Sequence, residues 1–387
     1  MRFKASIQNI HTFTKFTASL ASLGQIAWVR LDSKDVRFTV IPDSGTQVWS
    51  TLSIDSIFET YTIQSASEND TINLEVPLPV LHRALKSAQN AIAANIRLTK
   101  KDGIPLLSLT ITTLAMNTSS APLPTSSGFS GSRENGDRSS DGHVGDGFDD
   151  VFREESTENF GGRPDRETTV TQDIPVRVLA PASVEGLHEP RCREPDVHIV
   201  LPNLLQLKSI SDRFTKLALS TKAGRPGASL GPKLELSGNM HGCLRLSLKT
   251  DSLRISSLWT NLENPELDPA KVADGEAGLA NHPSTHMKQL GDATGQSELG
   301  WSTVRIEGKD WGRVLSVGRL GGRVIACFVN EHALILYVFL GGDDAGVGET
   351  VLTVSPSSTL VVNHTDFDSI ISLRTVLEGR NKCLAAN

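Results

Sequence analysis

Four short segments of alternating apolar and polar residues are each followed by a segment with the apolar spacing of an amphipathic helix. Alternation with a period of two is typical of a strand with one buried face, and spacings of three and four are typical of a helix that packs by one face. A chain made of such units buries its apolar residues by packing helices on sheets, which predicts an α+β fold. The four strand-like segments are RFKASI (2–7), INLEV (72–76), DVHIVL (196–201) and STVRIE (302–307).

The expected helices differ in how clearly the sequence marks them. The first is expected near 9–23, the second from Pro77 onward, the third after 201 and the fourth near 309–320, where two glycines weaken helix propensity. The stripes expected to be buried are Phe13, Phe16, Leu20 and Leu23 in the first helix, Leu78, Leu81, Leu85, Ala88 and Ile92 in the second, and Leu207, Ile210, Phe214 and Leu217 in the third.

The same pattern of two strand–helix units with further short strands occurs in both halves of the chain. This repetition predicts two similar domains, each with two helices packed on antiparallel sheets. Two segments interrupt the pattern. Residues 115–169 are rich in Ser, Gly, Asp and Glu and have the composition of a disordered linker, and residues 262–300 have that of a long surface loop.

These segments set the expected boundaries. An N-terminal domain is expected at 1–114, and a connector with a disordered acidic insertion at 115–172. A C-terminal domain is expected at 173–354, with a surface insertion at 264–298, followed by a tail at 355–387.

Charge is distributed unevenly along the chain, whose formal net charge is -6. Segment 115–169 holds 11 acids and 5 bases, and segment 262–300 holds 7 acids and 2 bases. Of the chain's 44 acids and 38 bases, 26 acids and 31 bases lie outside them, so the expected folded part carries a net charge of +5. The basic remainder favours an anionic partner.

The expected helices carry cations opposite their apolar stripes. The second helix lies in a stretch, Val76 to Lys101, that contains no carboxylate. Point charges without aromatic neighbours are typical of contacts with the phosphates of duplex DNA, whereas an ordinary solvated face that happens to be basic is the alternative for any single helix. The candidate DNA-facing residues are Lys15, Arg83, Lys86, Lys208, Arg213, Lys216 and Arg313.

Known catalytic and metal-binding motifs are missing from the sequence. The four cysteines lie far apart without CxxC or CxxH spacing, which favours reduced thiols and indicates neither disulfides nor zinc. No HExxH or GK[ST] motif occurs, and no apolar stretch reaches the 18 residues of a membrane span. We therefore expect no metal site, no cofactor, no membrane partner and no catalytic residue.

The order of strands and basic helices resembles the PCNA-type sliding clamps. Within that superfamily the resemblance is specific to the Hus-one subunit family of the nine-one-one DNA-damage checkpoint clamp, over roughly 1–114 and 170–354. Its most specific pieces are RALKSAQNA and QDIPVRV. The other pieces are MRFKASI, INLEVPLPVLH, EPDVHIVLPNLLQLKSISDRF and LWTNLENP. The tail 355–387 departs from the family.

The resemblance implies a PCNA-like clamp fold and a non-enzymatic role in the nucleus. It implies a ring of three subunits, with Rad-nine and Rad-one partners, that encircles double-stranded DNA, is placed by a Rad-seventeen type clamp loader, and recruits damage-signalling and repair proteins. It also places the seven candidate cations toward the channel. Two alternatives stay open: a homotrimeric replication processivity clamp, and a metal-dependent DNA nuclease acting on the same surface.

Overall fold

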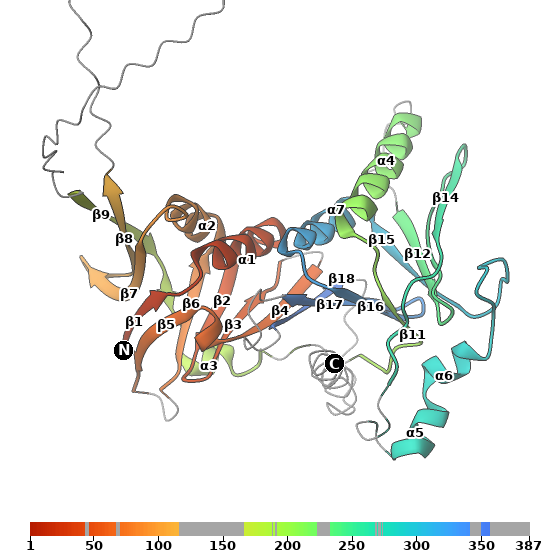
Figure 1. Cartoon of the computed structure of the whole chain (residues 1–387), viewed down its shortest axis with the longest axis horizontal. Helices are drawn as coiled ribbons and strands as arrows, with labels where there is room; N and C mark the ends of the chain where they lie inside the picture. The colour runs from red at the N-terminus through yellow and green to blue at the C-terminus, as the bar shows by residue number, and fades with distance from the viewer. Residues whose placement is uncertain are drawn as a thin grey trace, which may run out of the picture.

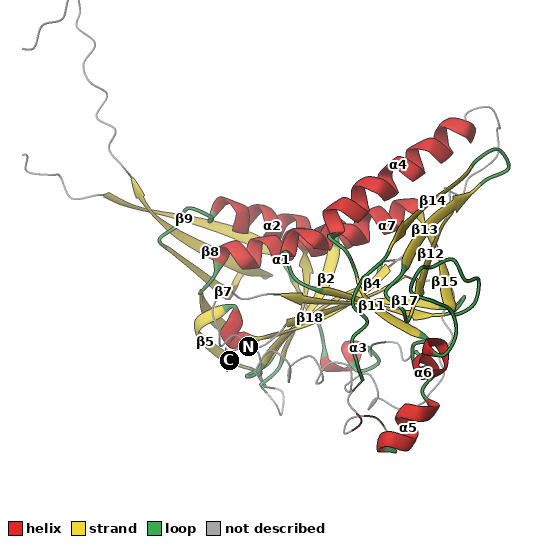
Figure 2. Ribbon diagram, turned by 45° about the vertical axis from the view of Figure 1, so that its right-hand side comes forward, coloured by secondary structure: helices red, strands yellow, loops and turns green. Residues whose placement is uncertain are grey.

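The structure is a computed structural model of the 387-residue chain. It describes all residues except 43–45, 67–69, 116–165, 188, 190–191, 223–232, 268, 270–271, 273, 341–349 and 357–387. The acidic insertion of the expected connector and most of the expected tail therefore lie outside the described residues. The strands form three sheets, and the longer helices lie together on one side of them (Figures 1 and 2).

The described part of the N-terminal half contains nine strands. Its helices are α1 (Ile10–Leu23) and α2 (Leu78–Ser87), with the 3₁₀ turn η1 (Ile54–Ser56). Its strands are β1 (Arg2–Ile7), β2 (Ile26–Leu31), β3 (Asp35–Val40), β4 (Thr46–Ser53), β5 (Phe58–Gln64), β6 (Ile72–Pro77), β7 (Ala93–Lys101), β8 (Ile104–Ala115) and β9 (Arg166–Pro175). One antiparallel sheet has the order β5-β1-β7-β8-β9.

The chain after β9 pairs once more with β6 of the N-terminal half and then repeats the plan. Its helices are α3 (Pro181–Val184), α4 (Leu204–Lys222), α5 (Gly275–Asn281), α6 (Pro283–Lys288), α7 (Gly308–Val314) and the 3₁₀ helix η3 (Leu315–Leu320). Its strands are β10 (Arg177–Val178), β11 (Val197–Val200), β12 (Lys233–Asn239), β13 (Leu244–Lys249), β14 (Arg254–Trp259), β15 (Trp301–Glu307), β16 (Val324–Val329), β17 (Ala333–Leu340) and β18 (Thr350–Pro356). A second antiparallel sheet has the order β14-β13-β12-β15.

A nine-stranded sheet joins the two halves, in the order β10-β6-β2-β3-β4-β18-β17-β16-β11. Its central pair is β4 and β18, which run antiparallel with Val48 opposite Val354. Backbone hydrogen bonds therefore cross from one half to the other, and the helix sides of both halves share one core cluster that includes Phe16, Leu85 and Phe328. The α+β fold and the two helices on the sheets of each half are as the sequence predicts.

The helix stripes are largely buried where the sequence predicts. All four residues in α1 are buried, and so are Leu78, Leu81, Leu85 and Ala88 around α2. Three positions differ, of which Ile210 is half-buried. Because α2 ends at Ser87, Ile92 lies beyond the helix and is 58% exposed. Leu217 is 44% exposed, and Ala218 is the buried residue at that turn of α4. The buried side of α4 thus passes from Phe214 to Ala218, a step of four residues, and Leu217 lies beside it.

Segments 115–172 and 264–298 contain regular structure among their described residues. Strand β9 lies partly inside 115–172 and pairs with β8, so it completes the N-terminal sheet. Segment 264–298 contains α5 and α6 and is tied to the C-terminal half by hydrogen bonds. Asn264 Nδ2 donates to the carbonyl oxygen of His198 at 2.7 Å, and Cys243 Sγ donates to that of Ala293 at 3.2 Å. This segment is therefore docked on the body of the domain.

Candidate nucleic-acid interface

Four helical segments form one row across both halves of the molecule. Helix α1 contacts α2 on one side and α7 with η3 on the other, and α4 packs against α7 and η3. The order across the row is α2, α1, α7 with η3, and α4, and all lie on the same side of the strands (Figures 1 and 2). Cations on these helices therefore share one surface.

The row is fixed on the N-terminal side by an aromatic and aliphatic core. Asn9 caps α1 by accepting from the backbone nitrogen of Thr12 at 2.9 Å, which satisfies one of the free donors of the first turn. Below the helix, Phe16 meets Phe38 of β3 edge to face, with ring centroids 5.2 Å apart. Burial of Phe16 holds α1 against the sheet, so its opposite face, with Lys15, is directed to solvent.

On the C-terminal side, α4 and α7 are joined by a buried hydrogen bond and by glycine contacts. Trp311 is 1% exposed, and its Nε1 donates to Ser211 Oγ at 3.1 Å. A Cβ at Gly318 would lie 2.7 Å from Leu204 Cβ. Gly312 also faces α4, near Asp212. The two glycines that weaken the sequence signal for the fourth helix, Gly312 and Gly318, therefore allow close packing against α4. Helix α7 is short, ending at Val314, and the chain continues directly as the 3₁₀ helix η3.

Six of the seven candidate DNA-facing residues are exposed on this row. Because the opposite side of each helix is buried, these cations lie on the surface turned away from the strands. They are Lys15 on α1, Arg83 and Lys86 on α2, Arg213 and Lys216 on α4, and Arg313 on α7.

The seventh residue, Lys208, is held within the protein. Its side chain is 30% exposed, and its Nζ lies 2.8 Å from the carbonyl oxygen of Gly312 and 3.4 Å from Asp212 Oδ2. The Lys208 ammonium group, which the sequence predicts on the DNA-facing surface, is therefore already engaged by two acceptors of the protein. Arg313 is also paired, with Asp310 Oδ1 at 3.5 Å, but its side chain is 47% exposed.

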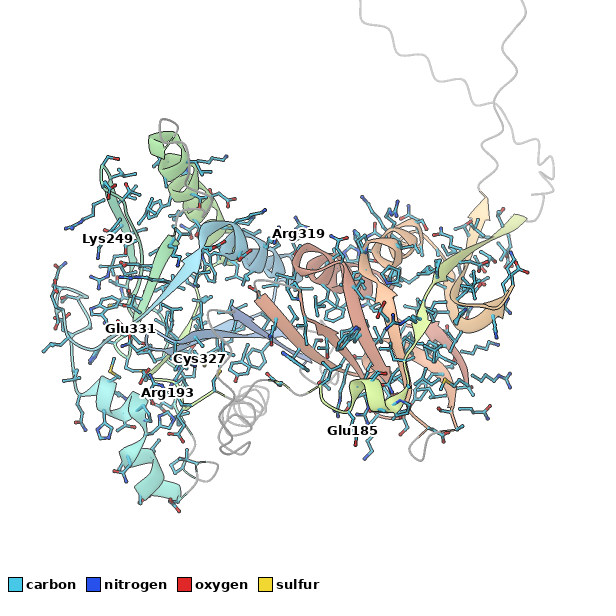
Figure 3. The ribbon with its side chains drawn as sticks, turned by 180° about the vertical axis from the view of Figure 1, so that it is seen from behind. Glu185, Arg193, Lys249, Arg319, Cys327 and Glu331 are labelled. Atoms are coloured by element: carbon cyan, nitrogen blue, oxygen red, sulfur yellow. The ribbon has the colours of Figure 1, made fainter. Side chains whose placement is uncertain are left out.

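Arg319 is a further cation of the row outside the candidate set. It is exposed on η3, the segment that packs against both α1 and α4. Figure 3 labels it on the helix side of the molecule, between the two halves. Its position is a result of the long-range packing of η3, and only its charge and its place in the fourth helical segment are visible in the sequence.

The described residues contain no group of three or more His, Cys, Asp or Glu side chains arranged to hold a metal ion. Nor does any helix in the described part of the chain have the length and apolar character needed to cross a membrane. The row of cationic helices is thus the surface on which a functional assignment depends.

Comparison with known proteins decides the family. A family model described as "Hus1-like protein" matches residues 1–354. The chain belongs to the Hus1-like family. Its Hus1-like relatives include "Checkpoint protein hus1" of Schizosaccharomyces pombe, which is 34% identical over 341 residues, 88% of this chain and 93% of that protein. "Checkpoint protein HUS1" of Homo sapiens is 25% identical over 274 residues, 69% of this chain and 76% of that protein.

Solved structures show that the Hus1-like chain has the PCNA clamp fold. Proliferating Cellular Nuclear Antigen from Entamoeba histolytica aligns with a TM-score of 0.52 at 12% identity, covering 92% of this chain and 99% of that chain. PCNA from Thermococcus kodakaraensis aligns with a TM-score of 0.50 at 13% identity, covering 92% of this chain and 100% of that chain. The resemblance to PCNA-type clamps and to the Hus-one family is confirmed.

Proposed function

We propose that this protein is a non-enzymatic subunit of a three-subunit checkpoint clamp that encircles double-stranded DNA in the nucleus and recruits damage-signalling and repair proteins. The observation that carries the proposal is the single row of helices across both halves, with Lys15, Arg83, Lys86, Arg213 and Lys216 exposed on one surface. The checkpoint names of the family relatives support the role in damage signalling.

The chemistry of the row suits sliding contact with a phosphate backbone. Exposed Lys and Arg side chains bind phosphates without reading sequence, and such contacts weaken steeply with salt. A ring keeps the protein on DNA by topology, so individual contacts can stay weak. The seven predicted DNA-facing residues are proposed to act together in this way, with Lys208 contributing charge from a fixed position.

Two strand edges suit ring closure. Among the described strands, β9 pairs only with β8 and β14 pairs only with β13, and these two edges lie at opposite ends of the molecule (Figure 1). An open edge of this kind pairs readily with another chain, and head-to-tail pairing of two different edges forms a ring when the rotation closes. We propose that subunits of the Rad-nine and Rad-one type occupy these edges and that a loader of the Rad-seventeen type opens the ring.

The test of assembly is co-purification. The full chain is expected to elute as a monomer alone and as a 1:1:1 complex after mixing with Rad-nine and Rad-one type subunits, with masses measured by light scattering. A homotrimer formed by this chain alone would overturn the heterotrimer and support the replication-clamp alternative, for which the PCNA-like fold is the supporting observation.

The test of the DNA surface is charge reversal on α2. In the assembled complex, Arg83→Glu with Lys86→Glu is expected to weaken duplex DNA binding and to reduce the slope of log affinity against log salt by about two, roughly one for each lost phosphate contact. Both side chains are exposed, so thermal unfolding should not change. Unchanged DNA affinity at low salt would contradict the assignment of the helix row.

A further inference from the structure

The four-stranded sheet β14-β13-β12-β15 has a second charged surface, on the face opposite the helices. One face of this sheet is apolar and packs toward α4 and α7, with Leu246, Leu236 and Val304 buried in register. The alternate residues form the other face. We call its cations the outer ladder: Lys233, Arg245, Lys249, Arg254 and Arg305. Duplex DNA on the helix row cannot reach the outer ladder, because the sheet lies between them (Figure 2).

A single acid organises the middle of the outer ladder. Glu235 on β12 is 15% exposed, and its carboxylate lies 3.3 Å from Lys249 Nζ and 3.0 Å from an Arg305 nitrogen. The two cations remain 56% and 71% exposed. One carboxylate carries one negative charge, so it positions both cations and leaves a net positive charge that faces solvent. The other acid of this face is Glu307, opposite Lys233 at its edge.

Next to this group, two cations face each other across strands. Lys249 of β13 is directly opposite Arg254 of β14, at the end of their hairpin, whose turn carries Asp251 (Figure 3 labels Lys249). Like charges directly opposite each other destabilise a sheet, and opposite charges stabilise it. Glu235 offsets part of this repulsion at Lys249, and the pair keeps two exposed cations side by side, which suits the binding of an anion.

The far end of the face is partly apolar. Arg245 stacks on the Trp301 ring, with its guanidinium carbon 4.2 Å from the ring centroid, and it lies opposite Leu258, which is 41% exposed. The docked segment 264–298 borders this end, because a Cβ at Gly295 would lie 3.4 Å from Leu258. The Asp292 carboxylate of that segment accepts a hydrogen bond from the Thr294 hydroxyl and others from the backbone of its own turn, and these bonds lower its pKa.

We propose that the outer ladder is a docking surface for an acidic, extended peptide segment of another protein. Carboxylates of the peptide pair with Lys249, Arg254 and Arg305, and an apolar side chain of the peptide contacts Leu258. Charge complementarity selects an anion, and the exposed leucine beside Arg245 suits a peptide side chain. A nucleic acid fits less well, because Glu235 interrupts the phosphate path and Arg245 covers the Trp301 ring on which a base would stack.

The surface is independent of ring assembly. It faces away from the helix row, and its cations stand on the face of the sheet, whereas ring closure is proposed to use the backbone edge of β14. The peptide is therefore expected to bind the isolated full chain as well as the assembled clamp, which separates this proposal from the proposed function.

The experiment uses a fluorescein-labelled peptide of alternating Glu and Leu, titrated with the full chain at low salt and followed by anisotropy. The decisive variant is Arg254→Glu. It places opposite charges across from each other at the hairpin, so thermal stability should stay equal or rise, whereas peptide affinity should fall about tenfold. The matched control, Arg83→Glu on α2, should leave peptide affinity unchanged.

Three outcomes would overturn the proposal. The first is that Arg254→Glu binds the peptide as tightly as the unaltered protein does. The second is that Arg254→Glu and Arg83→Glu lose the same amount of peptide affinity. The third is that the outer ladder binds a labelled single-stranded or duplex oligonucleotide in preference to the peptide. The last outcome would identify the outer ladder as a nucleic-acid surface.

Discussion

Lys208 Nζ on α4 donates a 2.8 Å hydrogen bond to the carbonyl oxygen of Gly312 on α7. These residues are 104 positions apart in the sequence, and their contact joins the two helices at the C-terminal end of the row. Lys208 also pairs with Asp212, one turn along the same helix. Lys208 is a candidate DNA-facing cation by its charge, and these contacts give it a structural role beside the proposed DNA surface.

We predict that Lys208→Met lowers the free energy of unfolding by about 1 kcal/mol, because a hydrogen bond from a charged donor to a partly buried carbonyl is lost. Chemical denaturation of the full chain measures this loss. The matched control is Lys216→Met on the exposed side of α4, which should change stability by less than about 0.5 kcal/mol. In the assembled clamp, Lys216→Met should weaken DNA binding more than Lys208→Met does; the reverse order would refute the structural role.

Close packing of η3 on α4 yields a second prediction. Gly318→Ala brings a methyl group to 2.7 Å from Leu204 Cβ, so the two segments must move apart. We expect a loss of about 1–3 kcal/mol, as for other overpacked cores. Gly186→Ala is the control, because a Cβ there meets no atom within 4 Å. A stable Gly318→Ala protein, measured by the same denaturation, would show that η3 does not pack tightly on α4.

The sequence predicts the buried faces of α1 and α2 well because the apolar residues there recur at helical spacing and the same face of each helix lies on the sheet. Phe13, Phe16 and Leu20 repeat at helical spacing and are all buried. It fails at Leu217, where the buried residue is Ala218, one position later. Spacings of three and of four both keep a residue near the same helix face, so local spacing alone does not decide which of the two neighbours is buried.

Exposed cations could be predicted from the sequence, whereas their pairing could not. Arg83 and Lys86 are free of carboxylate neighbours in the sequence, and both are exposed on α2. The contacts of Lys208 with Gly312 and of Glu235 with Arg305 join distant strands and helices, so they depend on tertiary packing. For the same reason the outer ladder is invisible in the sequence, since Glu235 and Arg305, which pair across β12 and β15, are 70 positions apart.

The exposed end of α4 gives a third prediction. Leu217→Gln should change the free energy of unfolding by less than about 0.5 kcal/mol, because the side chain is already 44% exposed. Leu207→Ala, ten residues earlier on α4 and 0% exposed, should cost about 2–5 kcal/mol. Urea unfolding of the two variants compares them directly. Similar losses in both would mean that the end of α4 packs as the periodicity predicts.

Two buried histidines give the last prediction. His198 on β11 is 1% exposed, and its Nε2 lies 2.7 Å from the carbonyl oxygen of Pro265. Burial, with smaller contributions from the charges of His282 and Lys288, lowers its pKa to about 4 against the opposing effect of the hydrogen bond to Pro265. Burial also lowers the pKa of His282, although Glu194 and Asp196 act in the opposite direction. Both imidazoles are therefore neutral in the folded protein at neutral pH.

A base whose pKa is lower in the folded state binds more protons when unfolded, so stability rises with pH between the two pKa values. For His198 this interval runs from about 4 to the unfolded value of about 6.5, and the associated change is on the order of 3 kcal/mol. Denaturation from pH 4.5 to 7.5 should show stability falling as pH falls below 6.5. His198→Gln should make this dependence shallower, with His282 supplying the remainder, and the exposed His11→Gln should leave it unchanged. An unaltered pH profile in His198→Gln would mean that His198 does not lose its proton on folding, and that segment 264–298 is not held by a neutral imidazole.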